Sequence, residues 1–217
     1  SGFVYALSIA DQFVKTGMYK TVLVVGAEIQ SSALDKSTEG RSSSVIFADG
    51  AGAAIVQATD EDRGILSTHL HADGDYAEEL YVKDPGSSRK VRLSKELLDG
   101  KTFNLTMNGN AVFKHAVVRF SEVIQEALQH NGLTPEDIDL LVPHQANLRI
   151  SNFVQKQFGL ADDKVFNNIM KLGNTTAASI PIAMSEAWEQ GRIKDGDLVC
   201  LAAFGSGFTW ASALNRW

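Results

Sequence analysis

Residues 138–158 read IDLLVPHQANLRISNFVQKQF, and this stretch decides the fold class. Residues 138–142 form an apolar run that is typical of a buried strand. Apolar residues then recur at helical spacing, which predicts a helix over 148–158. His144 stands on the short loop between the two elements. A strand that leads through a short loop into a helix is the unit from which α/β layers are built.

The same alternation continues on the C-terminal side and before the quoted stretch. A long apolar stripe predicts a helix over 112–128 that Gly132 ends. Further elements are expected as strands at 165–169, 198–204 and 209–214, and as a helix at 176–190. Strands and helices that alternate along the chain indicate an α/β layered domain.

The first hundred residues predict a more varied set of elements. Apolar residues at positions 3, 6, 7 and 10 lie on one face of a helix over 2–16, which Gly17 ends. Because a helix at the very first residues implies chain before it, we expect a preceding segment. Residues 73–104 are the least regular part, and long irregular stretches are often functional. Strands are expected at 21–25, 45–47, 53–56 and 65–70, with a polar loop over 34–44.

Composition excludes several classes of protein. The chain has 217 residues, of which 44% are hydrophobic, so it can bury a large core. The net charge of −6 leaves no basic footprint for nucleic acid. A single Cys excludes an internal disulfide framework and favours a reducing compartment such as the cytoplasm. No apolar run approaches the length of about 20 residues that a membrane span needs, so no membrane association is expected.

His144 and Asn174 are the residues best suited to chemistry. His144 follows a strand at the edge where open α/β sheets bind ligands. Asn174 stands on a glycine turn that opens a helix of small residues. Each side chain has an N–H group that suits stabilisation of a developing oxyanion. On sequence alone, structural roles fit equally well, since Asn is also a common turn residue.

Other polar residues admit plainer interpretations. Cys200 lies in an apolar run, where burial makes a thiol unreactive, so it is not expected to be a nucleophile. His69 and His71 would face one side of a strand, near Asp73 and Asp75, but we expect solvated polar residues and no metal site. Gly205-Ser206-Gly207 fits either a β-turn or a loop that points a backbone N–H at an anion.

Seven motifs taken together resemble the thiolase superfamily, and within it the β-ketoacyl-acyl-carrier-protein synthase III family. The two most specific motifs are VPHQANLRI at 142–150 and GNTTAAS at 173–179. The other motifs are SGF at 1–3, FADGAGA at 47–53, STHLHADG at 67–74, MNGN at 107–110 with VFK at 112–114, and FGSGFTW at 204–210. The motifs occur in family order from residue 1 to residue 217.

The resemblance implies a fold and an assembly. The family fold is a layered αβαβα sandwich of two similar α/β halves, normally in a homodimer. Residues 1–62 would be the end of the first half, which is incomplete here, and residues 63–217 would be the second half. A chain that lacks part of one half should expose a large apolar face.

The resemblance also implies an activity. The family's Cys-His-Asn triad places its His and Asn at His144 and Asn174, and its Cys immediately before Ser1. Such an enzyme condenses an acyl-CoA primer with malonyl-acyl-carrier protein and so initiates fatty acid biosynthesis. It needs no cofactor beyond the coenzyme A thioester substrate. The backbone N–H of Ser206 would help to form the oxyanion hole.

Binding residues carry over from the family in the same way. The pantetheine path would include Gly109, Phe113, Ala146 and Asn147, and the acyl carrier protein would dock on Lys114, Arg149 and Lys156. Gln157 departs from the family, where a second Lys often follows. Two alternatives remain open: a non-catalytic partner subunit without a nucleophile, or a related condensing enzyme of secondary metabolism.

Overall fold

A computed structural model describes residues 1–100 and 102–217 of the chain. Its helices are α1 (Gly2–Lys15), α2 (Arg41–Ser44), α3 (Lys95–Asp99), α4 (Gly109–His130), α5 (Leu148–Gln157), α6 (Ile169–Leu172) and α7 (Ser179–Glu189). Its strands are β1 (Thr21–Glu28), β2 (Gly50–Gln57), β3 (Gly64–Ala72), β4 (Leu80–Val82), β5 (Leu105–Met107), β6 (Leu140–Pro143), β7 (Leu198–Gly205) and β8 (Thr209–Arg216). Short 3-10 helices are η1 (Gly74–Glu79), η2 (Pro135–Asp137), η3 (Asp162–Lys164) and η4 (Thr176–Ala178).

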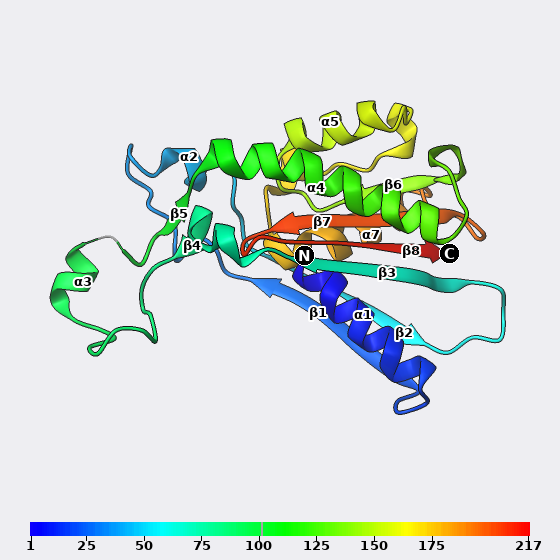
Figure 1. Cartoon of the computed structure of the whole chain (residues 1–217), viewed down its shortest axis with the longest axis horizontal. Coiled ribbons are helices and arrows are strands. Elements are labelled where there is room, and N and C mark those ends of the chain that lie inside the picture. The colour runs from blue at the N-terminus through cyan, green and yellow to red at the C-terminus, as the bar shows by residue number, and fades with distance from the viewer. Residues whose placement is uncertain (101) are drawn as a thin grey trace.

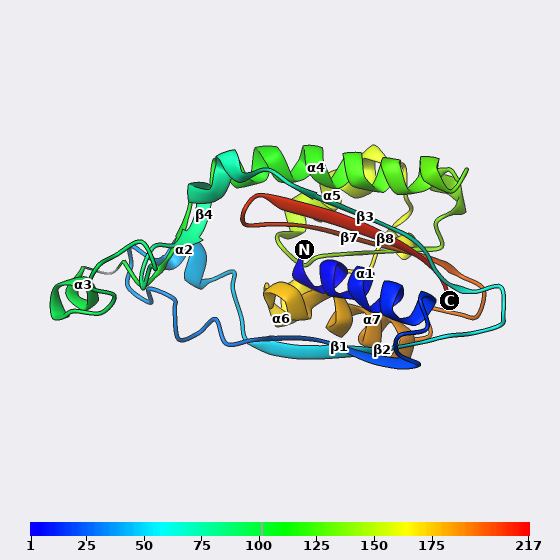
Figure 2. The ribbon, with the colours of Figure 1, turned by 60° about the horizontal axis from the view of Figure 1, so that its bottom comes forward.

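The elements form alternating layers of sheet and helix. An antiparallel pair, β1 and β2, forms one sheet, and a four-stranded sheet has the order β3-β8-β7-β6. Within the larger sheet β6 runs parallel to β7, and β8 is antiparallel to both of its neighbours. Figure 2 shows α1 and α7 between the two sheets and α4 and α5 on the outer face of the larger one. This arrangement confirms the α/β layered class that the alternating pattern predicted.

Strand β7 lies at the centre of the packing because both of its faces are buried. Alternate side chains of a strand point to opposite faces, so one strand can contribute to two cores. Cys200 and Phe204 join the core beneath α4 and α5, whereas Val199 and Leu201 join the core around α1 and α7. The continuous apolar run at 198–204 is therefore the consequence of helices on both sides.

Glycines allow the helix layer to approach the β1–β2 sheet closely. Gly26 and Gly52 are paired across the two strands. A Cβ atom at Gly26 would lie 2.6 Å from the carbonyl oxygen of Ala177, and one at Gly52 would lie 2.9 Å from the backbone nitrogen of Ile182. The segment that begins at Gly50 therefore both enters β2 and packs its backbone closely against the helix layer.

Three predicted elements differ from the structure. The expected strand at 45–47 is a turn after α2 that ends in a single bridge from Phe47 to Asn174, because its N–H groups bond back to the helix, as Phe47 does to Ser43. The expected strand at 165–169 reduces to a single bridge at Val165, because after Phe166 bonds to Leu141 the Gln145 side chain accepts the N–H groups of Asn168 and Ile169. The expected helix at 176–190 is split into η4 and α7.

The irregular stretch from β4 to β5 forms an extension, here called the arm, whose two ends lie side by side because these two strands pair. Strands β4 and β5 pair antiparallel where the arm leaves and rejoins the rest of the chain, and α3 lies at its far end (Figure 1). Within the arm, Arg89 makes a two-pronged ion pair with buried Asp84. Lys101 lies outside the described residues.

The outer face of the β1–β2 sheet is apolar and open to solvent. Leu23 is 62% exposed and Ile55 is 67% exposed, whereas their neighbours Val24 and Val56 face the helix layer. The expectation of an exposed apolar face is thus confirmed. Among the described residues, no helix has both the length and the apolar character needed to cross a membrane.

Candidate functional site

One cavity collects most of the residues singled out from the sequence. It has a volume of about 650 Å³ and lies where the N-terminal end of α1, the loop after β6 and the loop after β7 meet. Its wall includes His144, Asn174 and Ser206, together with Ser1 and Gly2 at the start of α1. Three separate loops therefore place the predicted polar residues around a single space.

His144 is held at the floor of this cavity by the strand before it. Its backbone N–H donates to the carbonyl of Ala202 over 2.7 Å, which extends the pairing of β6 with β7 by one residue. On the ring, Nδ1 lies 2.6 Å from the hydroxyl oxygen of Ser179. Burial lowers the pKa of the His144 ring to about 3. The imidazole is consequently neutral at physiological pH.

Asn174 is held by its backbone and by its own side chain. Its backbone donates to Ile46 over 2.8 Å and accepts from Ala48 over 2.9 Å. Its Oδ1 accepts the backbone N–H of Thr176 over 2.9 Å. Because the carbonyl end of the amide is occupied in this way, the Nδ2 donor is the end left for the cavity.

Gly173 sets the path of the chain into Asn174. Its φ of 71° lies in the left-handed region that favours glycine. A Cβ atom there would lie 2.9 Å from the carbonyl oxygen of Ile46. The glycine of the GNTTAAS motif is thus required by close backbone approach, which the sequence pattern alone did not reveal.

The N-terminal end of α1 points at the same cavity. The helix has 14 residues, so its terminal N–H groups and dipole favour negative charge at Ser1 or just before it. The hydroxyl of Ser1 donates to the carbonyl of Thr209 over 3.0 Å, and a Cβ atom on Gly205 would lie 3.4 Å from the Ser1 nitrogen. The start of α1 is therefore packed against the loop that carries Ser206.

The four residues assigned to the pantetheine path also line the cavity. Gly109 and Phe113 come from the first turns of α4, and Ala146 and Asn147 come from the loop before α5. Asn147 also caps α5, since its Oδ1 accepts the backbone N–H of Arg149 over 2.9 Å. The arm contributes apolar wall residues that sequence reasoning missed, which are Leu80, Tyr81, Val82, Leu105 and Met107.

The three predicted carrier-protein residues are exposed outside the cavity on two adjacent helices. Lys114 lies on α4, and Arg149 and Lys156 lie on α5. The guanidinium of Arg149 stands 5.3 Å from the ring centre of Phe113, so this cation is next to the cavity wall. Gln157, which departs from the family pattern, bonds to the Ser121 hydroxyl over 2.7 Å and ties α5 to α4.

Cys200 is confirmed as a buried side chain within β7. Burial raises the pKa of its thiol to about 12, so thiolate is negligible at neutral pH. We expect a thiol-alkylating reagent to leave Cys200 unmodified in the folded full-length protein, and Cys200→Ala to retain activity within about twofold. Peptide mapping by mass spectrometry after alkylation tests this, and labelling of Cys200 in the native protein would contradict it.

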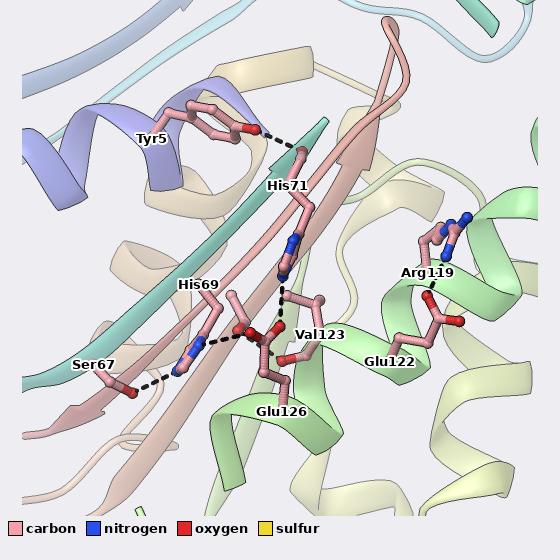
Figure 3. Close-up of polar contacts among 9 residues, drawn as sticks. Tyr5, Ser67, His69, His71, Arg119, Glu122, Val123 and Glu126 are labelled. Carbon is pink, nitrogen blue, oxygen red and sulfur yellow. Dashed lines mark hydrogen bonds and ion pairs between the residues drawn. The ribbon is translucent and has the colours of Figure 1, made fainter. Parts of the chain in front are cut away.

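His69 and His71 do face one side of β3, as expected, but they meet a carboxylate of α4 (Figure 3). His69 Nδ1 lies 3.3 Å and His71 Nε2 lies 2.6 Å from the two oxygens of Glu126. Asp73 instead accepts the backbone N–H of Asp75 over 3.1 Å and so caps η1. Within the described ranges, no group of three or more His, Cys, Asp or Glu side chains is arranged to hold a metal ion.

Gln145 and Ser179 are structural partners of the site that sequence reasoning did not assign. The Gln145 side chain donates to the carbonyls of Pro143 and Phe166 and accepts two N–H groups, so it joins the His144 loop to the loop before α6. Ser179 contacts the His144 ring directly. Both residues stand inside the two quoted motifs, but most of their partners are distant in sequence.

Comparison with family models identifies both ends of the chain. A model described as 3-oxoacyl-(acyl-carrier-protein) synthase III matches residues 1–74, and one described as the C-terminal part of the same synthase matches residues 128–217.

Curated relatives match over the whole chain. A β-ketoacyl-(acyl-carrier-protein) synthase III from Caldanaerobacter subterraneus subsp. tengcongensis is 46% identical over 217 residues, which is 100% of this chain and 64% of that protein. The protein of the same description from Escherichia coli K12 is 47% identical and is covered to the same extents. The chain therefore spans just under two thirds of the length of these relatives.

Solved structures are similar to this chain over 99–100% of its length. A β-ketoacyl-(acyl carrier protein) synthase III from Thermus thermophilus has a TM-score of 0.90 at 43% identity, covering 100% of this chain and 65% of that one. The priming β-ketosynthase of the R1128 polyketide pathway has a TM-score of 0.85 at 33% identity, covering 99% and 63%.

Proposed function

Since this chain belongs to the 3-oxoacyl-(acyl-carrier-protein) synthase III family, we propose that the full-length protein condenses an acyl-CoA primer with malonyl-acyl-carrier protein, releasing CO₂ and forming a 3-oxoacyl-acyl-carrier protein. One observation carries the proposal. His144 and Asn174 line one cavity, and Ser179 and Thr176 occupy their Nδ1 and Oδ1 atoms, so that Nε2 and Nδ2 are the atoms left to meet a substrate.

In the first stage a Cys thiolate, proposed to precede Ser1, attacks the thioester carbonyl of acyl-CoA. The carbonyl oxygen gains negative charge, the carbon–sulfur bond to coenzyme A breaks, and the acyl group remains on the Cys. The N-terminal end of α1 favours the thiolate. The Ser206 backbone N–H, on the loop packed against Ser1, is proposed to stabilise the oxyanion.

In the second stage the malonyl thioester loses CO₂, and the electron pair of the broken bond becomes an enolate. His144 and Asn174 donate N–H hydrogen bonds to the thioester oxygen as its charge develops. The enolate carbon then attacks the acyl–Cys carbonyl and displaces the Cys thiolate. Because His144 is neutral, it acts as a hydrogen-bond donor without gaining a proton beforehand.

The surroundings of the cavity support the proposed substrates. Gly109, Phe113, Ala146 and Asn147 would line the path of the pantetheine arm, and no further cofactor is proposed. Phosphopantetheine of the acidic carrier protein would enter past Arg149, with Lys114 and Lys156 beside it on the exposed helix faces.

We further propose that the protein is a cytoplasmic homodimer. Residues 1–62 would form the end of one α/β half, and residues 63–217 would form the other half. The order α1-β1-β2 and the order α7-β7-β8 each place a helix before an antiparallel strand pair, which supports this division. The single buried thiol of the described chain supports a reducing compartment.

The test is to incubate the full-length protein with acyl-CoA and malonyl-acyl-carrier protein, and to measure acyl-enzyme and product by intact mass. We expect an acyl adduct and 3-oxoacyl-carrier protein. Absence of any adduct would favour the non-catalytic partner subunit, and turnover only with malonyl-CoA would favour a different condensing enzyme.

Arg149→Glu tests the proposed carrier-protein surface. Reversing a charge at the cavity rim should lower kcat/KM for malonyl-acyl-carrier protein by about tenfold and leave acylation by acyl-CoA unchanged. Lys194→Glu is the matched control, since Lys194 is exposed before β7, at the opposite end of that strand from the cavity. Equal effects of the two variants would contradict the docking role of Arg149.

A further inference from the structure

We propose that Ser179 is a positioning residue that holds the His144 ring in the tautomer with its proton on Nε2. The inference rests on the proposed function, because only that tautomer directs an N–H donor at the malonyl thioester. It assigns a role to a side chain that the motif comparison would count as one more small residue at the start of a helix.

The neighbours of the Ser179 hydroxyl restrict the hydrogen bonds that it can make. Ser179 is the first residue of α7 and is 2% exposed. Its Oγ lies 3.3 Å from the backbone nitrogen of Gln145 and 2.6 Å from Nδ1 of His144. A backbone N–H can only donate, so Gln145 occupies one lone pair of the oxygen. The hydroxyl proton then has Nδ1 as its acceptor.

The opposite tautomer would leave a buried group without a partner. If Nδ1 carried the proton, it would donate to Oγ, and Oγ would then accept two hydrogen bonds. Among the hydrogen bonds of the described residues, none offers the Ser179 proton another acceptor. A buried donor without an acceptor is costly, whereas the Nε2-protonated form satisfies every atom of the pair.

Because the His144 ring is neutral, the choice between its two tautomers decides whether Nε2 donates or accepts a hydrogen bond. A neutral imidazole carries one proton, so one nitrogen donates and the other accepts. Burial keeps the His144 ring neutral, as its lowered pKa indicates. Without a partner at Nδ1 both tautomers would be populated, and the form with Nδ1 protonated would present a lone pair to the developing enolate oxygen.

One short segment therefore prepares both donors of the site. Thr176 occupies Oδ1 of Asn174, and Ser179 occupies Nδ1 of His144, so residues 174–179 direct both N–H groups at the cavity. This placement is the preorganisation that stabilises developing charge at no cost in reorganisation during the reaction.

The test combines a spectrum with a rate in the full-length protein. Histidine labelled with ¹⁵N reports which ring nitrogen is protonated, and the His144→Ala variant assigns the signal of His144. We expect a protonated Nε2 and an unprotonated Nδ1 in the wild type. Ser179→Ala should give mixed tautomers and lower malonyl decarboxylation by about tenfold to a hundredfold. The magnitude is taken by analogy from metal-binding His residues in other proteins, which lose about as much activity when the partner that orients the ring is removed.

Acylation by acyl-CoA should stay unchanged in Ser179→Ala, since it does not use the His144 donor. Ser179→Thr keeps a hydroxyl and should keep the wild-type tautomer. Ser151→Ala is the matched control, because the Ser151 hydroxyl is also buried on a helix but has no hydrogen-bond partner among the described residues. We expect that control to alter neither the spectrum nor the rate.

Two outcomes overturn the inference while leaving the proposed function standing. One is a wild-type spectrum with His144 protonated on Nδ1, which decides the matter even where Ser179→Ala does not fold. The other is an active protein in which Ser179→Ala changes neither the tautomer nor the decarboxylation rate. Lack of condensation by the wild type would instead overturn the proposed function, and the spectrum would still report the Ser179–His144 pair.

Discussion

Replacing His144 or Asn174 by Ala in the full-length protein should lower malonyl decarboxylation by about a hundredfold or more, the usual effect of removing one oxyanion donor. In the proposed reaction the thioester oxygen gains its charge only as CO₂ leaves, so the loss should fall on this step. Acylation by acyl-CoA should remain largely intact, because the proposed thiolate is favoured by the end of α1 and its oxyanion by Ser206.

Release of CO₂ from malonyl-acyl-carrier protein and the intact mass of the acyl-enzyme measure the two steps separately. His130→Ala and Asn152→Ala are matched controls, because both residues are exposed and neither lines the cavity. Loss of acylation in both test variants would contradict the assigned roles of His144 and Asn174.

Gln145→Ala should destabilise the full-length protein by about 4 kcal/mol, since several buried backbone groups would lose their partner at about 1–3 kcal/mol each. Gln145 is 2% exposed. Its amide donates to Pro143 over 2.8 Å and accepts from Asn168 over 2.9 Å, with longer bonds to Phe166 (3.3 Å) and Ile169 (3.1 Å). The alanine side chain cannot replace any of these bonds, and the loop that carries His144 would lose its tie to α6.

Chemical denaturation of the wild type and of Gln145→Ala measures the difference in their free energies of unfolding. Gln129→Ala is the matched control, because Gln129 is exposed near the end of α4 and its substitution should change stability by less than about 0.5 kcal/mol. A loss below about 1 kcal/mol for Gln145→Ala would show that the loop is held mainly by other contacts.

Elements with a strong apolar period were predictable from sequence. The stripe from Val112 to Leu128 became α4, and the runs at 198–204 and 209–214 became β7 and β8. In each element the apolar pattern follows burial. A helix that packs on a sheet is apolar along one face, and a strand between two helix layers is apolar on both faces. Cys200 was predicted as buried for the same reason, and it is.

Elements whose backbone groups bond to side chains instead of to other backbone groups were not predictable. Residues 165–169 have a strand-like composition, yet Gln145 takes the N–H groups that would have continued the strand. Thr176 gives its N–H to the Asn174 side chain, which delays α7 until Ser179. In each case a side-chain carboxamide competes with regular backbone pairing.

The sequence by itself indicated the layered class and the family and pointed to His144 and Asn174 as candidate site residues, because motif spacing and apolar period are local properties of the chain. Only the tertiary structure decided which way those two side chains present their donors. Ser179 lies 35 residues beyond His144 in the chain, yet its hydroxyl is in hydrogen-bond contact with the imidazole ring. Orientation depends on partners that folding alone brings together, and a hydrogen bond needs both partners within about 3 Å.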